Sequence, residues 1–219
     1  MRDYSKYTRF VLLAVLAFTT WLMARISVNY LPMRNDVGFL RIKQQYIGIE
    51  HWRMAFFIHV YSSLWVLFAG FTQFSKNLLR KRPKLHRNLG YVYVVDILLV
   101  TGPAGLLMGF YANGGLSSRV GFVLLACLWM YFTAMAFYKA KQGEFRQHRW
   151  FMMRSYALTL SAITLRLWKY AITNIPGFEP RPMDVYRWVA WMGFVPNLLF
   201  VEWMIWKERR KRAMRLKHV

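Results

Sequence analysis

Long apolar stretches alternate with short polar ones along the whole chain. The apolar stretches cover residues 10–29, 54–74, 90–111, 119–139, 150–172 and 185–206. A bilayer core about 30 Å thick is crossed by roughly 20 apolar residues in an α-helix, and each stretch reaches that length. None alternates apolar and polar residues with the period of two that is typical of membrane β-strands. The pattern therefore predicts an all-α integral membrane protein with six transmembrane helices.

Glycine and proline residues separate or bend these predicted helices. Residues 113–115 (Asn-Gly-Gly) predict a tight turn, and residues 176–182 predict a longer loop. Pro103 predicts a kink within the third helix, which membrane proteins tolerate when neighbouring groups satisfy the freed carbonyl. The first apolar stretch follows Arg9 without a small-residue cleavage site behind it, so we expect it to remain as a helix. The whole chain, residues 1–219, is interpreted as one membrane domain.

Composition and charge support this interpretation and predict an orientation. The chain is 57% hydrophobic and carries a net charge of +22, with the basic residues gathered between the apolar stretches. That distribution is typical of orientation signals rather than of nucleic-acid binding. One side holds 20 Lys and Arg, in the N-terminus, residues 75–88 and 139–149, and the basic tail 207–219. The other side holds 7, in residues 30–53, 112–119 and 173–187. Both termini are therefore expected in the cytoplasm, where the basic side meets anionic lipid headgroups.

Two similar segments enter the membrane from the basic side. Residues 84–87 (Lys-Leu-His-Arg) open the third helix, and residues 146–149 (Arg-Gln-His-Arg) open the fifth. Their histidines, His86 and His148, are thereby expected at one depth. A neutral imidazole is a good axial ligand for haem iron, so the pair predicts a b-type haem near the cytoplasmic face. The arginine that follows each histidine could meet a haem propionate.

Helical periodicity adds further candidates to this site. At about 100° per residue, Tyr93 shares a stripe with His86, and Arg166 shares a stripe with His148. We expect Tyr93 to line the haem site, and Arg154 and Arg166 to tune the charge near it. An equally open interpretation is that Arg166 extends outward to the membrane surface.

His59 lies on the second helix, nearer the outer leaflet, on a face with small and polar residues. It could bind a second cofactor there. A second haem would need a partner on the fourth helix, which contains no histidine and offers only Met130 and Met135.

Charged residues at membrane depth are costly and mark function or pairing. In one interpretation, Asp96 and Arg154 form a structural ion pair. In another, Asp96, Arg154 and Glu202 are stations on a pathway, and the chain is a non-enzymatic helical subunit or a small-solute or proton pathway protein without haem. Zinc-hydrolase and serine-hydrolase motifs do not occur, and whether the chain is an enzyme stays open.

Several short motifs resemble a bacterial multi-pass membrane family, domain of unknown function 2306. They are residues 69–74 (AGFTQF), 85–90 (LHRNLG), 113–115 (NGG), 148–150 (HRW), 153–158 (MRSYAL) and 164–166 (TLR). The resemblance spans about His51 to Trp168. It implies a location in the bacterial inner membrane, and the family has no established activity.

Six helices, with the second to fifth forming a core and the other two peripheral, also resemble diheme b-type transmembrane electron-transfer cytochromes. In that family, helices three and five hold one haem, and helices two and four hold the other. The resemblance implies a haem b bound by His86 and His148, with electrons passing between a quinone or small carrier and a partner. Because the fourth helix has no histidine, it implies one haem rather than two. The oligomeric state is not predicted.

Overall fold

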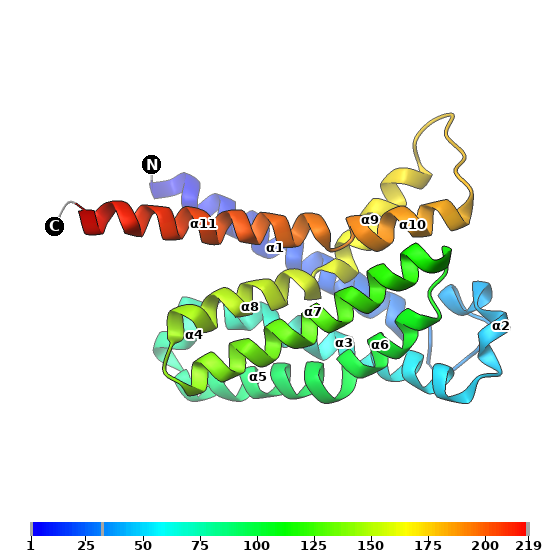
Figure 1. Ribbon diagram of the computed structural model, residues 1–219, viewed down its shortest axis with the longest axis horizontal. Coiled ribbons are helices and arrows are strands. Elements are labelled where there is room, and N and C mark those ends of the chain that lie inside the picture. Colours follow the sequence, from blue (N-terminus) through cyan, green and yellow to red (C-terminus); the bar gives the residue numbers. More distant parts are fainter. Residues whose placement is uncertain (1, 32, 218–219) are drawn as a thin grey trace.

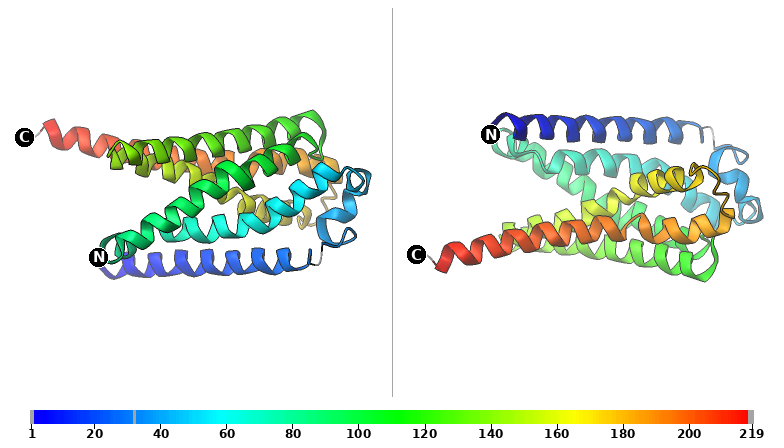
Figure 2. Two further views of the ribbon diagram at one scale, coloured as in Figure 1. Left: turned by 90° about the horizontal axis from the view of Figure 1, so that it is seen from below. Right: turned by 90° about the horizontal axis from the view of Figure 1, so that it is seen from above.

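The computed structural model describes residues 2–31 and 33–217, which form the helical bundle in Figures 1 and 2. Its elements are α1 (Arg2–Val28), η1 (Gly38–Ile42), α2 (Gln44–Ile47), α3 (Glu50–Gln73), α4 (Lys76–Lys81), α5 (Pro83–Asp96), η2 (Ile97–Thr101), α6 (Gly102–Phe110), α7 (Gly115–Lys141), α8 (Phe145–Thr159), α9 (Ser161–Thr173), α10 (Pro182–Met192) and α11 (Val195–Lys217). The described residues contain no strand, so the all-α prediction is confirmed. The segment expected to be a basic tail continues α11 as helix as far as Lys217.

The two ends of the bundle differ in which segments they carry. Both chain termini, α4 and the α7–α8 turn lie at one end, called here the terminal end (Figure 1). The segment with η1 and α2, the α6–α7 turn and the α9–α10 loop lie at the other, called the loop end. The segments predicted to share a membrane side therefore share an end of the bundle.

Four segments of the described chain are long and apolar enough to cross a membrane. They are Glu50–Gly70, Pro83–Phe110, Gly115–Lys141 and Pro182–Arg215. They correspond to the predicted second, third, fourth and sixth spans. The predicted fifth span is divided between α8 and α9, of 15 and 13 residues, which are not among these four. The structure thus supports a membrane protein with several apolar helices.

The buried core lies where α3, α5, α7 and α8 meet. Its members are Val66, Ala69, Tyr93, Ile97, Trp129, Ala136, Met152, Tyr156, Leu158 and Phe194. Close approach of α3 depends on Gly70, because a Cβ atom there would lie 2.5 Å from the Tyr156 ring and 2.8 Å from the Tyr93 ring. This packing brings the polar faces of α5 and α8 together.

The predicted kink in the third helix appears as a π-helical turn. Helix α5 passes into η2, which has π-helical geometry, and α6 begins at Gly102. Pro103 has no N–H to donate, which favours such an irregular turn just before it. A Cβ atom at Gly102 would lie 2.1 Å from the Ile97 carbonyl oxygen, so the turn requires glycine there.

The predicted fifth and sixth helices are each broken, at Leu160 and at Gly193. The two breaks lie together, joined by side chains. Asn197 Nδ2 donates to the Ala157 carbonyl at 3.1 Å and to Thr164 Oγ1 at 3.0 Å, and Thr164 Oγ1 donates to the Gly193 carbonyl. Side chains therefore take up backbone acceptors that an interrupted helix leaves free.

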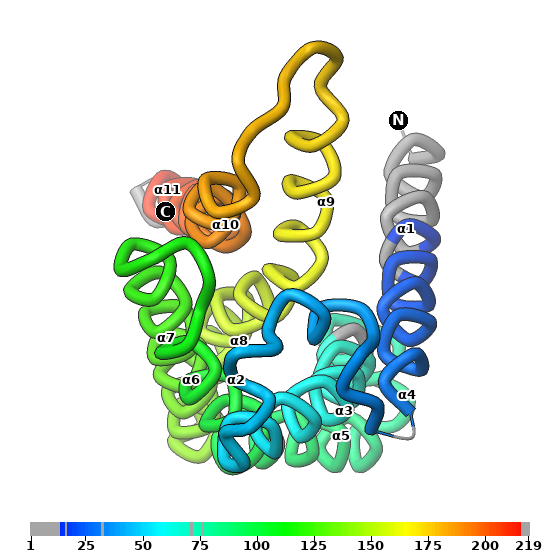
Figure 3. The backbone as a smooth tube through the Cα atoms, turned by 90° about the vertical axis from the view of Figure 1, so that its right-hand side faces the viewer, coloured from blue at the N-terminus to red at the C-terminus, as the bar shows by residue number. Residues whose placement is uncertain are grey.

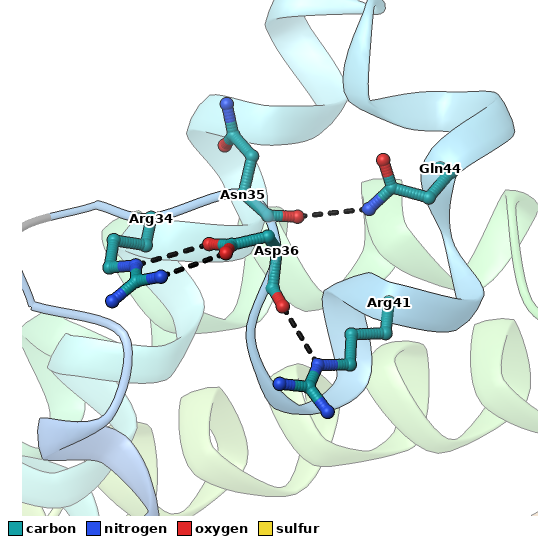
Figure 4. Close-up of polar contacts among 5 residues, drawn as sticks. All are labelled: Arg34, Asn35, Asp36, Arg41 and Gln44. Carbon is teal, nitrogen blue, oxygen red and sulfur yellow. Dashed lines mark hydrogen bonds and ion pairs between the residues drawn. The ribbon is translucent and has the colours of Figure 1, made fainter.

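A compact polar segment joins α1 to α3 at the loop end (Figure 4). Arg34 donates to the Asp36 carboxylate at 3.1 and 2.8 Å, and Arg41 Nε donates to the Asp36 carbonyl at 2.8 Å. Gln44 Nε2 donates to the Asn35 carbonyl at 3.0 Å. These bonds hold the segment in one shape.

Lys43, at the start of α2, is buried under this segment and is 1% exposed. Its Nζ donates to the Tyr111 carbonyl and lies 4.5 Å from the centre of the Tyr46 ring and 5.9 Å from that of Trp52. Burial, together with the charge of Arg119, lowers the pKa of the Lys43 ammonium to about 8. The sequence analysis did not single out this residue; the surrounding aromatic residues were its only signal.

Candidate functional site

A buried hydrogen bond sets the register between α5 and α8. Tyr93 Oη on α5 lies 2.8 Å from Ser155 Oγ and 2.9 Å from Thr159 Oγ1, both on α8. All three residues are buried. Both helices start at the terminal end of the bundle and run in the same direction (Figure 1). A given number of residues back from this bond therefore reaches the same level on both helices.

His86 and His148 each lie seven residues before a member of that bond. Seven residues are nearly two full turns, so His86 shares the face of Tyr93 and His148 shares the face of Ser155. Since Tyr93 and Ser155 face each other, His86 and His148 lie on the corresponding faces of α5 and α8, about 10 Å nearer the terminal end. That the two histidines meet there stays a prediction.

The hydrogen bonds around the two rings leave particular nitrogen atoms available. His148 Nδ1 lies 2.8 Å from the Ala136 carbonyl oxygen of α7, which can only accept, so Nδ1 carries the hydrogen. The lone pair of His148 Nε2 is then free in the neutral ring. His86 Nδ1 is buried without a hydrogen-bond partner, and so is Gln73 Nε2 on α3. Buried polar atoms are rarely left unpaired in folded proteins.

Hydroxyl and indole groups close the site toward the loop end. Trp129 Nε1 donates to Thr159 Oγ1 at 3.0 Å, and Thr133 Oγ1 lies 2.7 Å from Ser155 Oγ. Tyr93 thereby belongs to a fully paired network across three helices, and its role in lining the His86 site stays a prediction. The sequence analysis missed Trp129 and Thr133, whose spacing of four residues on α7 was the available signal.

Arg154 does not pair with Asp96, so that interpretation is wrong. Its guanidinium binds the Glu202 carboxylate of α11, with Nη2 2.8 Å from Oε2, and lies over the Phe151 ring at 5.3 Å. Asp96 Oδ1 instead lies within hydrogen-bond distance of Thr101 Oγ1. Arg154 fixes α8 against α11, with its charge already neutralised.

Arg166 and His148 do not share a stripe, because the break at Leu160 separates α8 from α9. Seen from the loop end, α9 rises between α1 and α10, away from α5 and α7 (Figure 3). Arg166 Nη1 donates to the Ala162 carbonyl at 2.6 Å. The stripe that was predicted to join Arg166 to His148 is therefore interrupted, and a role for Arg166 in tuning the charge of the site stays a prediction.

His59 lies toward the loop end, apart from His86 and His148. Its Nδ1 donates to the Thr101 carbonyl at 3.0 Å. A Cβ atom at Gly105 would lie 2.9 Å from its Cε1, so α6 packs directly on the ring. His59 on α3 therefore packs against the π-helical turn. Among the residues that the structure describes, no three or more His, Cys, Asp or Glu side chains gather as a metal site would require.

The apolar spans and the polar site inside the bundle define a multi-pass α-helical membrane protein. A family model described as "Predicted membrane protein (DUF2306)" matches residues 56–205. The chain therefore belongs to the DUF2306 family of membrane proteins, as its motifs indicated. No curated protein and no solved structure matches the chain.

Proposed function

We propose that this protein is a membrane redox protein that holds one b-type haem between His86 and His148. The observation that carries the proposal is the matched register of α5 and α8. From the Tyr93–Ser155 hydrogen bond, which is 2.8 Å long, we infer that the two histidines lie opposite each other at one level. Two imidazoles opposed in this way are the ligand set of a b-type haem.

The residues at this site fit a b-type haem. The porphyrin supplies four ligands to the iron, so two side chains complete the set, and a cluster of three protein ligands is not needed. A ligating histidine typically donates its other N–H to a carbonyl or carboxylate, as His148 does to Ala136. A bound haem would supply a one-electron carrier at the terminal end of the bundle.

The neighbouring side chains would then shape the site. Tyr93 forms its wall toward the loop end, where the paired hydroxyl network excludes water. Arg87, exposed at the terminal end, is free to meet a propionate, whereas Arg149 pairs with Glu208 of α11. Arg154 acts through Glu202 by holding α8 in place, and so positions His148 rather than touching a ligand.

We further propose six spans, with α1 as the first and α8–α9 as the fifth, and the terminal end in the cytoplasm of a bacterial inner membrane. The excess of basic residues at that end supports this orientation. Lys207 lies 3.8 Å from the Trp203 ring and Arg209 lies 4.5 Å from the Trp150 ring, a pairing suited to anionic headgroups. Electrons would pass between a quinone or another small carrier and a partner.

The test replaces each histidine and measures haem in the purified protein. We expect His86→Ala and His148→Ala each to lose the haem absorption while still inserting into the membrane. The matched control is His51→Ala, because His51 lies at the loop end and bonds Tyr111 Oη at 2.9 Å. Full haem content in both site variants, or equal loss in the control, would refute the assignment.

A further inference from the structure

Asp96 is a carboxyl group without a counter-ion in the middle of the apolar span Pro83–Phe110. It is the one Asp, Glu, Lys or Arg between residues 88 and 118. The neighbouring helix α3 has no Asp, Glu, Lys or Arg between residues 54 and 75, and α7 has none between residues 120 and 138. Asp96 forms none of the ion pairs found in the described part of the chain. An ionised carboxylate in this position would be very costly.

A chain of oxygen atoms leads from Asp96 across the π-helical turn to α3. Thr101 Oγ1 lies within hydrogen-bond distance of Asp96 Oδ1 and 2.6 Å from Ser62 Oγ. Ser62 Oγ lies 2.6 Å from the Ile58 carbonyl oxygen. Each of these three contacts is close enough to require a hydrogen between its two oxygens.

The three contacts need three hydrogens, and the hydroxyl groups supply two. Thr101 and Ser62 carry one each, and the Ile58 carbonyl can only accept. The third must belong to Asp96. The consistent order is then Asp96 O–H to Thr101, Thr101 O–H to Ser62, and Ser62 O–H to the Ile58 carbonyl. With an ionised Asp96, two oxygens would face each other at 2.6 Å with no hydrogen between them.

From this count we propose that Asp96 is an intramembrane proton-binding site, which holds an exchangeable proton at neutral pH. The titratable group that contacts the same turn is His59, whose Nδ1 donates to the Thr101 carbonyl at 3.0 Å. Nothing in the hydrogen count depends on haem, so the proposal stands or falls independently of the redox function.

Loss of the proton would rearrange the turn. An ionised Asp96 takes the Thr101 hydroxyl hydrogen for itself, so either Ser62 or Ile58 loses its bond. Since Ser62 lies on α3 and Thr101 in η2, the packing of these two elements would respond to the protonation of Asp96. The site therefore couples proton binding to the contact between α3 and η2.

Infrared spectroscopy of the purified full-length protein tests the proposal. At neutral pH we expect a carbonyl stretch from a protonated carboxyl group that shifts in D2O, because the other carboxyl groups ionise at this pH. Asp96→Asn should lose this band. Asp184→Asn is the matched control, because Asp184 lies 3.3 Å from Arg187 at the loop end, and should keep it. A wild-type protein without the band, or a band that survives in Asp96→Asn, would overturn the proposal.

The Thr101→Val variant provides a second test, in which the Asp96 carboxyl group is kept. Valine preserves the shape of threonine and removes the oxygen that accepts from Asp96. The band should persist in this variant and move to higher frequency, because the carboxyl group loses its hydrogen-bond acceptor. A band at the wild-type frequency would show that Thr101 is not the partner of a protonated Asp96 and would overturn the hydrogen count, whether or not Asp96→Asn folds.

Discussion

Tyr93→Phe tests the bond that aligns α5 with α8. The change removes one hydroxyl and two contacts, of 2.8 Å to Ser155 and 2.9 Å to Thr159, and leaves the buried ring in place. Hydrogen bonds between membrane helices contribute about 0.6 kcal/mol on average and at most about 1.7 kcal/mol. Ser155 keeps Thr133 and Thr159 keeps Trp129, so no polar atom is left unpaired. We therefore expect a loss of about 1 kcal/mol.

The assay is reversible unfolding in mixed detergent micelles, followed by circular dichroism. Tyr91→Phe is the matched control, because Tyr91 lies on the same helix, is 40% exposed, and packs edge-on against Phe137. The control should stay within about 0.5 kcal/mol of wild type. A Tyr93→Phe variant as stable as the control would refute the role of the bond. A loss above about 3 kcal/mol would show that a partner had been stranded, contrary to the pairing described.

Three further changes test other parts of the fold. Gly102→Ala should lower the thermal midpoint by the equivalent of about 1–3 kcal/mol, because its Cβ would meet a backbone carbonyl at 2.1 Å, whereas Gly48→Ala, with open space around it, should not. The thermal midpoint should rise as the pH increases from about 8 to 10.5, because over this range Lys43 keeps its proton in the unfolded state but has released it in the folded state. Lys43→Met should abolish this rise. Arg154→Ala should cost about 1–3 kcal/mol in chemical unfolding by leaving the carboxylate of Glu202 unpaired, and adding Glu202→Gln should recover part of the loss.

The helices and their shared ends were predictable because the length and composition of an apolar stretch largely decide whether it forms a spanning helix. The common end of the bundle at which His86 and His148 lie was also predictable, since both residues belong to short basic segments at that end. Seven-residue spacing to Tyr93 and Ser155 was also visible in the sequence. That these two residues bond to each other depended on how the bundle places α5 across from α8.

The break at Leu160 was not predictable from local sequence, because the run around it is apolar and contains no proline. The break at Gly193 did have a local signal in Gly193 and Pro196, since proline is favoured in the first turn of a helix and disfavoured in its interior. The breaks are stabilised by Asn197, which donates to acceptors of α8 and α9 from α11. Because a helical face cannot be extended through a break, the stripe that was predicted to join Arg166 to His148 is interrupted at Leu160.

Partners of charged groups were the least predictable feature. Asp96 and Arg154 are opposite charges at similar depth, but their helices do not bring them together. Arg154 pairs with Glu202 on α11, and Asp96 contacts Thr101 in the adjoining η2. The sequence supplies the charges and their depth, whereas the choice of partner depends on which helices pack side by side.

The most direct test of the account is an absorption spectrum of the detergent-purified protein from haem-supplied cells, before and after reduction with dithionite. The account predicts a Soret band, with α and β bands that sharpen on reduction, as for a low-spin haem with two imidazole ligands. His86→Ala and His148→Ala should each abolish it. A featureless visible spectrum from the folded wild-type protein would contradict the proposed function.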